Sequence, residues 1–498
     1  MLLSWTIAVL TPAVGPEQGS TLLVSASHVL DRLSVTADDA SLIAGAGLVL
    51  PATLGQRLGL PELLDTQVRA GPHAAEKCLT VIHSALAGGD CIDDVDALRA
   101  GATAAVLGHR VAAPSTVGTF LRSMSWGHAR QLDAVARRLV VRAAAAGALA
   151  GGAAPVVVDI DATLVETYGL AKAGARQVMR TGRRGYHPLL AVLAGTGDVL
   201  HARLRRGRSN DATGAGSFVA ETLARLEQAR AAADRSGPVV LRADSGFYLA
   251  EVLAACRRRG VGFSIGARML GRMRAAITAV PEHRWTPVPY FEPGAAVTEL
   301  DWVVFDQHRP TPDSNWRGNG LRVRLIVRRT PTPPGIRERG AGRAGRAGRA
   351  GRAGRVDPAQ QELFPTFEYH PFITDQPGDL VELDVFHRGH AEVELAIRDL
   401  KYGFGLNHLP SGQFGTNQAW LVLQTIAHNL ARWTARLGGI AATARQTIKT
   451  LRRRYLAVPA RLVHHARGQR LRLPTGWPWA SGLLTALTRL RALPEPSG

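Results

Sequence analysis

The segment PVVVDIDATL at 155–164 constrains the fold more than any other stretch of the 498-residue chain. Its valine-rich run predicts a β-strand that is buried on at least one face. Asp159 and Asp161 follow at the end of this strand, and burying two carboxylates is costly unless they are paired, solvated or bound to a metal ion. Because side chains alternate along a strand, both aspartates point to the same face, and alternation does not choose between them.

The segments that follow predict a mixed sheet covered by helices. HPLLAVLAGTGDVLHARLRRG at 187–207 has two apolar runs around a Gly-Thr-Gly-Asp turn, which predicts a β-hairpin. Alternating helices and strands are predicted after it, at 212–233 (helix), 238–247 (strand), 249–260 (helix) and 262–268 (strand). Three antiparallel strands followed by alternating helices and strands are the order of the ribonuclease H-like α/β fold.

Two strand ends carry the carboxylates from which we expect chemistry. Asp161 lies nearer the C-terminal end of its strand than Asp159, where open α/β sheets usually present their ligands. Asp244 ends the valine-rich strand at 238–247, which neighbours the first strand in the predicted order. Such a pair suits Mg²⁺, which takes hard oxygen ligands, whereas either aspartate alone is more typical of a helix cap or turn.

The helix predicted at 390–405 offers two candidates for a third acid, Glu392 and Glu394. Both flank its apolar stripe, which consists of Val393, Ile397, Leu400 and Phe404. Glu394 shares its side with three cations suited to a phosphodiester: His390, Arg398 and Lys401. Glu392 lies on a side that is more typical of a solvated face. An i,i+4 ion pair between Glu394 and Arg398 would give the same pattern.

Five regions are expected along the chain. They are a helical N-terminal DNA-binding region (1–150), the first part of a catalytic core (151–268), a β-rich insertion (269–370), the second part of the core (371–440) and a basic C-terminal region (441–498). The insertion includes tandem Ala-Gly-Arg triplets at 340–355, whose low complexity and like charge predict a disordered loop. A DNA-touching arm is the alternative interpretation of these triplets.

The segment GHRVAAPSTVGTFLRSM at 108–124 matches a helix-turn-helix loosely. Pro114 and Ser115 would begin a helix with outward side chains suited to a DNA groove: Thr116, Thr119, Arg122 and Ser123. An ordinary helical bundle is the alternative.

Basic residues dominate the charge of the chain. The 60 Lys and Arg residues outnumber the 40 Asp and Glu residues, which gives a net charge of +20 and a pI near 11.1. Such a cation attracts polyanions, and arginine binds phosphate oxygens in pairs. The three cysteines have no paired spacing, which argues against disulfides or a zinc ribbon and favours a cytoplasmic protein. The apolar start MLLSWTIAVLTPAVG lacks a basic n-region, and no stretch approaches transmembrane length.

Four segments together resemble the cut-and-paste DDE transposases of bacterial insertion sequences, in the group with a β-rich insertion before the last acid. They are DIDAT at 159–163, GYHPLLAVLAGTGDVLHARLRRG at 185–207, LRADSGF at 241–247, and ELAIRDLKYGFGLNHLPSGQFGTNQAW from 394. The resemblance implies that Asp161, Asp244 and Glu394 form a catalytic triad holding two Mg²⁺ ions, with Mn²⁺ as a substitute. The assignment of Glu394 depends on the spacing from Glu394 to Lys401, which matches the glutamate-to-lysine spacing of the family. The family pattern has Tyr and Arg where this chain has His387 and His390, so phosphate contacts and any hairpin step that needs the tyrosine are in doubt.

The resemblance implies an enzyme that cuts an insertion sequence at its inverted-repeat ends and joins the 3′-OH ends to target DNA by two-metal-ion hydrolysis and transesterification. Its partners would be double-stranded DNA and, in the DNA complex, a second copy of the chain. It would bind no membrane, and it would be located in the cytoplasm in association with the nucleoid. Five residues are expected to contact DNA phosphates: His390, Arg398, Lys401, Arg205 and Arg122. A metal-dependent nuclease of the same fold and a non-catalytic DNA-binding protein are the alternatives.

Overall fold

The computed structural model describes residues 30, 33–178, 182–306, 320–332, 367–441, 446–466 and 468–495. The apolar N-terminal segment and the Ala-Gly-Arg triplets lie outside these residues, so the predictions made for them stay predictions. None of the described helices is long and apolar enough to cross a membrane.

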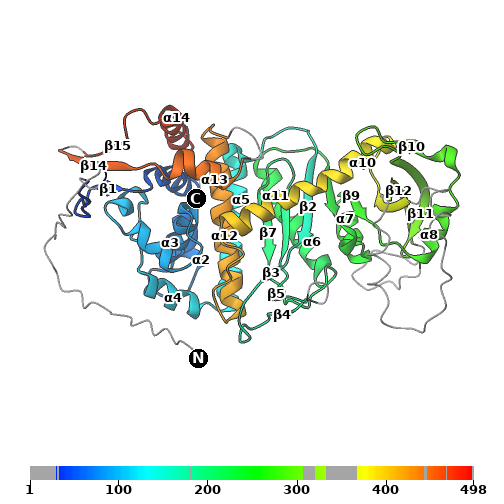
Figure 1. The fold of residues 1–498 in the computed structure, drawn as a ribbon, viewed down its shortest axis with the longest axis horizontal. Helices are drawn as coiled ribbons and strands as arrows, with labels where there is room; N and C mark the ends of the chain where they lie inside the picture. The colour runs from blue at the N-terminus through cyan, green and yellow to red at the C-terminus, as the bar shows by residue number, and fades with distance from the viewer. Residues whose placement is uncertain are drawn as a thin grey trace, which may run out of the picture.

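One nine-stranded mixed sheet forms the centre of the molecule (Figure 1). The five strands of its core are β2 (Val156–Ala162), β6 (Leu189–Leu193), β7 (Val199–Arg203), β8 (Val239–Ala243) and β9 (Gly262–Gly266). β2, β6 and β7 are antiparallel neighbours, and β8 and β9 add parallel strands on the other side of β2. This order, β7-β6-β2-β8-β9, confirms the predicted ribonuclease H-like α/β fold.

The predicted β-rich insertion prolongs this same sheet. Its strands are β10 (Thr286–Pro287), β11 (Ala296–Val304), β12 (Leu321–Pro331) and β13 (Phe367–Thr374). β13 pairs antiparallel with β9, with Phe372 opposite Gly266, so the insertion joins the core edge directly. The helix α8 (Gly271–Thr278) leads into these strands.

Helices cover the core of the sheet. They are α6 (Ala215–Ala232), α7 (Ala250–Arg258), α10 (Leu380–Arg388), α11 (Glu392–Gly403) and α12 (Phe414–Leu437). α12 is buried nearly all round, and polar side chains such as Asn429 are buried in it together with apolar ones. Asn429 ties it to β7, because its side chain accepts a hydrogen bond from Val199 N at 2.8 Å and donates one to Val199 O at 2.8 Å. α11 packs against β2 and β6, which places the late acids beside the central strand.

The N-terminal and C-terminal regions form one body beside the sheet (Figure 1). The N-terminal helices are α1 (Val49–Arg57), α2 (Leu60–Gln67), α3 (Ala74–Ala87), α4 (Pro114–Ser123) and α5 (Trp126–Ala143). The C-terminal elements are α13 (Ile448–Leu451), β14 (Ala460–His465), β15 (Gly468–Arg472) and α14 (Ala480–Arg491). The strand β1 (Leu42–Ile43) pairs with β14, and α14 packs on α1.

The remaining elements are short. Three strands form a separate small sheet: β3 (Val165–Glu166), β4 (Arg176–Gln177) and β5 (Arg184–Tyr186). Single turns of 3-10 helix lie at Ala46–Leu48, Asp93–Leu98, Thr103–Val106, Ser245–Phe247, Glu282–Arg284 and Gly389–Ala391. π turns extend α5 at Ala144–Ala148 and α13 at Arg452–Leu456.

Candidate active site

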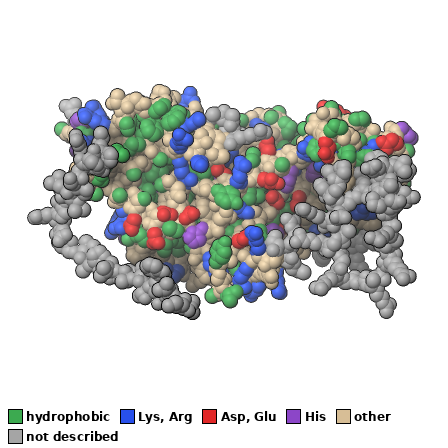
Figure 2. Space-filling view, viewed as in Figure 1, with side chains coloured by type: hydrophobic (Ala, Val, Ile, Leu, Met, Phe, Trp, Pro, Cys, Tyr) green, Lys and Arg blue, Asp and Glu red, His purple; other side chains and the backbone are tan. Residues whose placement is uncertain are grey.

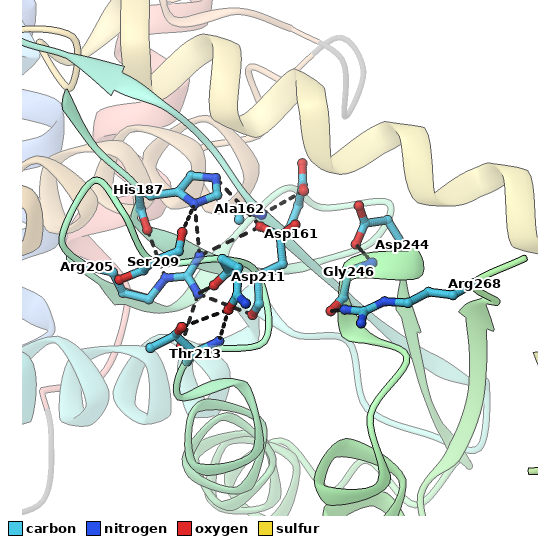
Figure 3. A network of polar contacts seen from close by, with 11 residues as sticks. Asp161, Ala162, His187, Arg205, Ser209, Asp211, Thr213, Asp244, Gly246 and Arg268 are labelled. Carbon is cyan, nitrogen blue, oxygen red and sulfur yellow. Dashed lines mark hydrogen bonds and ion pairs between the residues drawn. The ribbon is translucent and has the colours of Figure 1, made fainter. Parts of the chain in front are cut away.

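Asp161 and Asp244 lie at the ends of neighbouring parallel strands. In the β2–β8 register Ile160 lies opposite Ala243. Asp161 directly follows Ile160, and Asp244 directly follows Ala243. Asp161 accepts a hydrogen bond from Ala162 N at 2.7 Å, and Asp244 accepts one from Gly246 N at 3.0 Å as it begins the 3-10 turn. Figure 3 shows the two side chains from these strand ends facing the same space.

Burial and like charge act together on Asp161. Burial is the largest of the causes that together raise the pKa of its carboxyl group to about 6; His390 and the hydrogen bond from Ala162 N oppose the shift, and the carboxylates of Asp244 and Asp211 add to it. A carboxylate that is half-buried beside other carboxylates is stabilised by a cation. Carboxylate oxygens are the ligands that hard divalent cations prefer, although among the described residues no three acidic side chains of this site bring their ligand atoms within 4.8 Å of one another.

Asp211 is a third carboxylate at this site, and the sequence reasoning missed it. It belongs to the loop between β7 and α6, and Figure 3 shows it beside Asp161. Its Oδ1 atom lies 3.7 Å from His187 Nε2 and 3.9 Å from Arg205 Nη2. A Cβ atom on Gly246 would lie only 2.6 Å from Asp211 Oδ2, so the Asp211 loop closes tightly on the Asp244 turn. A lone aspartate in a polar loop gives no sequence signal for this approach.

Arg205, expected to contact DNA, is instead buried beneath the Asp211 loop. Its side chain is 6% exposed, and its guanidinium donates hydrogen bonds to four backbone carbonyls, of His187, Asn210, Asp211 and Thr213. Burial lowers the pKa of Arg205 to about 10. In this structure the residue supports the loop and does not face DNA, because its donors are used by these carbonyls.

Asp159 forms a buried ion pair on the same face of β2. Its two carboxylate oxygens accept hydrogen bonds from Arg242 Nε at 2.7 Å and Arg242 Nη2 at 2.8 Å. Arg242 Nη1 donates to Phe386 O at 2.6 Å, and its guanidinium lies 5.0 Å from the centre of the Phe386 ring. A Cβ atom on Gly389 would lie 2.2 Å from Arg242 Nη1, so a larger residue there would displace this guanidinium. The Asp159–Arg242 pair thus anchors the end of α10 to the sheet.

Two side chains of the late helical segment reach the backbone around Asp161. His390 Nε2 lies 3.0 Å from Ile160 O, and Lys401 Nζ donates to Leu164 O at 2.8 Å. Burial lowers the pKa of Lys401, and Glu166 and Asp161 oppose this shift. Both residues were predicted to hold phosphates, and in this structure they brace α11 against the strand.

Glu394 lies on the helix face between these two braces and is exposed. Among the residues that the structure describes, it makes no hydrogen bond or ion pair, so the alternative pairing with Arg398 is not formed. Glu392 points to the other side, where its Oε2 accepts a hydrogen bond from Gly195 N at 3.2 Å. The exposed Glu394 carboxylate is therefore available for a ligand.

The other predicted contacts differ in exposure. Arg398 on α11 and Arg122 on α4 are exposed, as a DNA contact requires. His387, at the position of the family tyrosine, is partly buried: it stacks on Phe372 at 4.2 Å between ring centres, and its Nδ1 lies 2.9 Å from Ser264 Oγ. Burial lowers the pKa of His387 to about 3, so it packs as a neutral ring.

Comparison with known proteins assigns the family. Residues 28–304 and 355–495 match the family model described as transposase DDE domain group 1. The chain is a member of this DDE transposase family. No curated protein matches the chain. A solved structure of the piggyBac transposase synaptic complex with hairpin DNA is similar at 10% sequence identity and a TM-score of 0.41, covering 82% of this chain and 79% of that chain.

Membership in the DDE transposase family covers both halves of the core and the regions around it. The match includes β2 and β8, whose ends carry Asp161 and Asp244, and α11, which carries Glu394. It also includes the C-terminal elements as far as residue 495. The candidate site of this transposase therefore lies entirely within the matched residues.

Proposed function

We propose that this protein is a DNA transposase that cuts an insertion sequence at its inverted-repeat ends and joins the freed 3′-OH ends to target DNA. The observation that carries the proposal is the pair Asp161 and Asp244 at adjacent parallel strand ends, in a chain of the DDE transposase family. Carboxylates held this way suit phosphodiester chemistry, because they can hold a divalent cation beside the reacting phosphate.

Asp161, Asp244 and Glu394 are the residues that would hold the metal, with Mg²⁺ as the proposed ion and Mn²⁺ as a substitute. Bound ions of this kind activate the nucleophile and stabilise the leaving 3′ oxygen. The protein contributes orientation: backbone amides of Ala162 and Gly246 fix the two strand-end carboxylates. His390 and Lys401 fix the helix that carries Glu394 by binding the backbone on both sides of Asp161.

The substrate is proposed to be double-stranded DNA, both at the element ends and at the target. The net charge of +20 supports this choice, since binding to DNA phosphates releases counterions and favours cations. Arg398 lies exposed one turn beyond Glu394, within the helix face that would meet the phosphodiester. A homodimer in the DNA complex would hold two element ends together.

The test uses purified full-length protein, a plasmid target and a pre-cleaved duplex carrying the inverted repeat that borders the gene. With Mg²⁺ we expect joining of the 3′-OH end to the plasmid, detected as a labelled product, and no product in EDTA. Cleavage without joining would indicate a metal-dependent nuclease. Duplex binding with neither cleavage nor joining would indicate a non-catalytic DNA-binding protein.

A matched pair of variants tests the third acid. Glu394→Gln is expected to abolish joining while duplex binding persists. Glu392→Gln, on the other side of the same helix turn, is expected to keep most of the activity, because the Glu392 carboxylate is bound by the backbone amide of Gly195. The reverse result would show that the third acid is Glu392.

A further inference from the structure

The C-terminal region holds a large part of the unbalanced positive charge. Residues 441–498 contain eleven Lys and Arg residues and one acidic side chain, Glu495. Glu495 is already paired with Arg57 at 3.1 Å. Figure 2 shows Lys and Arg side chains over the α13–α14 part of this region. Acidic side chains of the same region therefore do not neutralise its charge.

The register of β14 and β15 sorts their side chains onto two faces. Leu462 pairs with Leu471, and these two residues turn inward. Leu462 and Ala460 are buried in the core, and Leu471 packs against it. Directly opposed residues of antiparallel strands share a face, so the sheet has one apolar inner face that fixes it to the body.

The outer face of the same sheet carries three arginines. Arg461 pairs with Arg472, and Val463 pairs with Arg470, which puts all three guanidinium groups on one side. We name this surface, made by Arg461, Arg470 and Arg472, the ribbon face. All three arginines are exposed. Like charges directly opposite each other are destabilising, so this arrangement costs stability unless an anion covers it.

Only one of the three arginines has an anionic neighbour. Arg461 forms an ion pair with Asp39. Arg470 and Arg472 have no hydrogen-bond or ion-pair partner within the part of the chain that the structure describes. Residues i and i+2 of a strand are about 6.7 Å apart, so these two guanidinium groups can reach separate anionic groups.

We propose that the ribbon face binds the phosphate backbone of double-stranded DNA. This inference rests on the proposed transposase function, and it assigns a DNA-holding surface outside the carboxylate site. In Figure 1 the β14–β15 hairpin and the β10–β12 insertion lie at opposite ends of the molecule, with α11 between them. DNA held by the ribbon face would therefore lie at a distance from the carboxylate site beside α11.

The test measures binding of the full-length protein to a 5′-labelled duplex of arbitrary sequence over a series of salt concentrations. For Arg470→Ala/Arg472→Ala we expect weaker binding and a slope of log K against log salt that is less negative by about 1.8, about 0.9 for each lost phosphate contact. The matched control is Arg257→Ala/Arg322→Ala, which removes two exposed arginines from α7 and β12 and should leave the slope unchanged.

Two readouts separate this inference from the proposed function. Thermal unfolding shows whether either double variant loses its fold, and Arg470→Lys/Arg472→Lys, which keeps the charge, should retain the wild-type slope. Equal slopes for the ribbon and control double variants would overturn the inference, even if strand transfer is found. A less negative slope confined to the ribbon variant supports it, even if the wild-type protein fails to join DNA ends.

Discussion

Asp159 and Asp161 lie two residues apart on one face of β2, but their neighbours at β8 differ in charge. One aspartate has a cationic neighbour and the other an anionic one. Asp159 faces Arg242, which binds both of its carboxylate oxygens. Asp161 faces the end of β8, where the neighbour is Asp244, and Asp211 approaches from a loop. The first pair is neutralised within the protein, whereas the second group gathers like charge. The register with the neighbouring strand thus decides which carboxylate is neutralised within the protein and which lies beside other carboxylates.

The largest expected effect is on strand transfer, and it comes from removing one negative charge from the group around Asp161 and Asp244. Asp161→Asn keeps the shape of the side chain, so we expect the fold to persist and strand transfer to fall by about 10³-fold or more, equivalent to about 4 kcal/mol. Without metal, the variant should unfold at a slightly higher temperature than the wild type, because one of several like charges is gone.

Joining assays with Mg²⁺ and thermal unfolding in EDTA measure the two effects of Asp161→Asn. Asp244→Asn is expected to give the same pair of results. A loss of stability in either variant as large as that expected below for Asp159→Asn would contradict the distinction between the Asp159–Arg242 ion pair and the carboxylates around Asp161.

The second effect is on stability. Asp159→Asn leaves the Arg242 guanidinium buried without its carboxylate, and we expect the free energy of unfolding to fall by about 3–5 kcal/mol. Urea unfolding measures this change. The double variant Asp159→Leu/Arg242→Met should recover most of the loss, because replacing a whole buried ion pair with apolar side chains is often neutral. Normal stability in Asp159→Asn would mean that the ion pair does not anchor α10.

Part of this arrangement can be predicted from the sequence. The strand order follows from periodicity and turn signals, and the positions of Asp161 and Asp244 follow from their place after valine-rich strands. A structural role for Asp159 is what remains once Asp161 is taken as the metal ligand, but its partner Arg242 could not be predicted, because it depends on which residue of β8 lies opposite Asp159. Sequence patterns describe one element at a time, whereas a register joins two elements.

The wrong or missing predictions share a physical cause. Arg205 has the sequence character of an exposed cation, yet four carbonyls of folded loops surround it. His387 is partly buried because Phe372, on a strand 15 residues earlier in the chain, stacks on its ring. Asp211 reaches the site only because its loop closes over Gly246. Each of these positions depends on a tertiary contact that no local pattern records.

The smallest expected effect concerns Asp211, the acidic residue that reaches the site from a loop. If it supports the metal from beside Asp161, Asp211→Asn should weaken Mn²⁺ binding by about 10–100-fold while the fold remains intact. Titration calorimetry with Mn²⁺ in the absence of DNA measures the affinity, and added metal should restore strand transfer. The matched control is Asp65→Asn on α2, which removes the same charge from an exposed position far along the chain from the site.

Asp211 also tests how far the comparison between the two groups extends. Its carboxylate lies near His187 and Arg205 as well as near Asp161, so it stands between a neutralised and a like-charged environment. An Mn²⁺ affinity that falls in Asp211→Asn and not in Asp65→Asn would place it with Asp161. An unchanged affinity together with a lower unfolding temperature would place it with Asp159, because its carboxylate would then serve to hold the loop over Arg205.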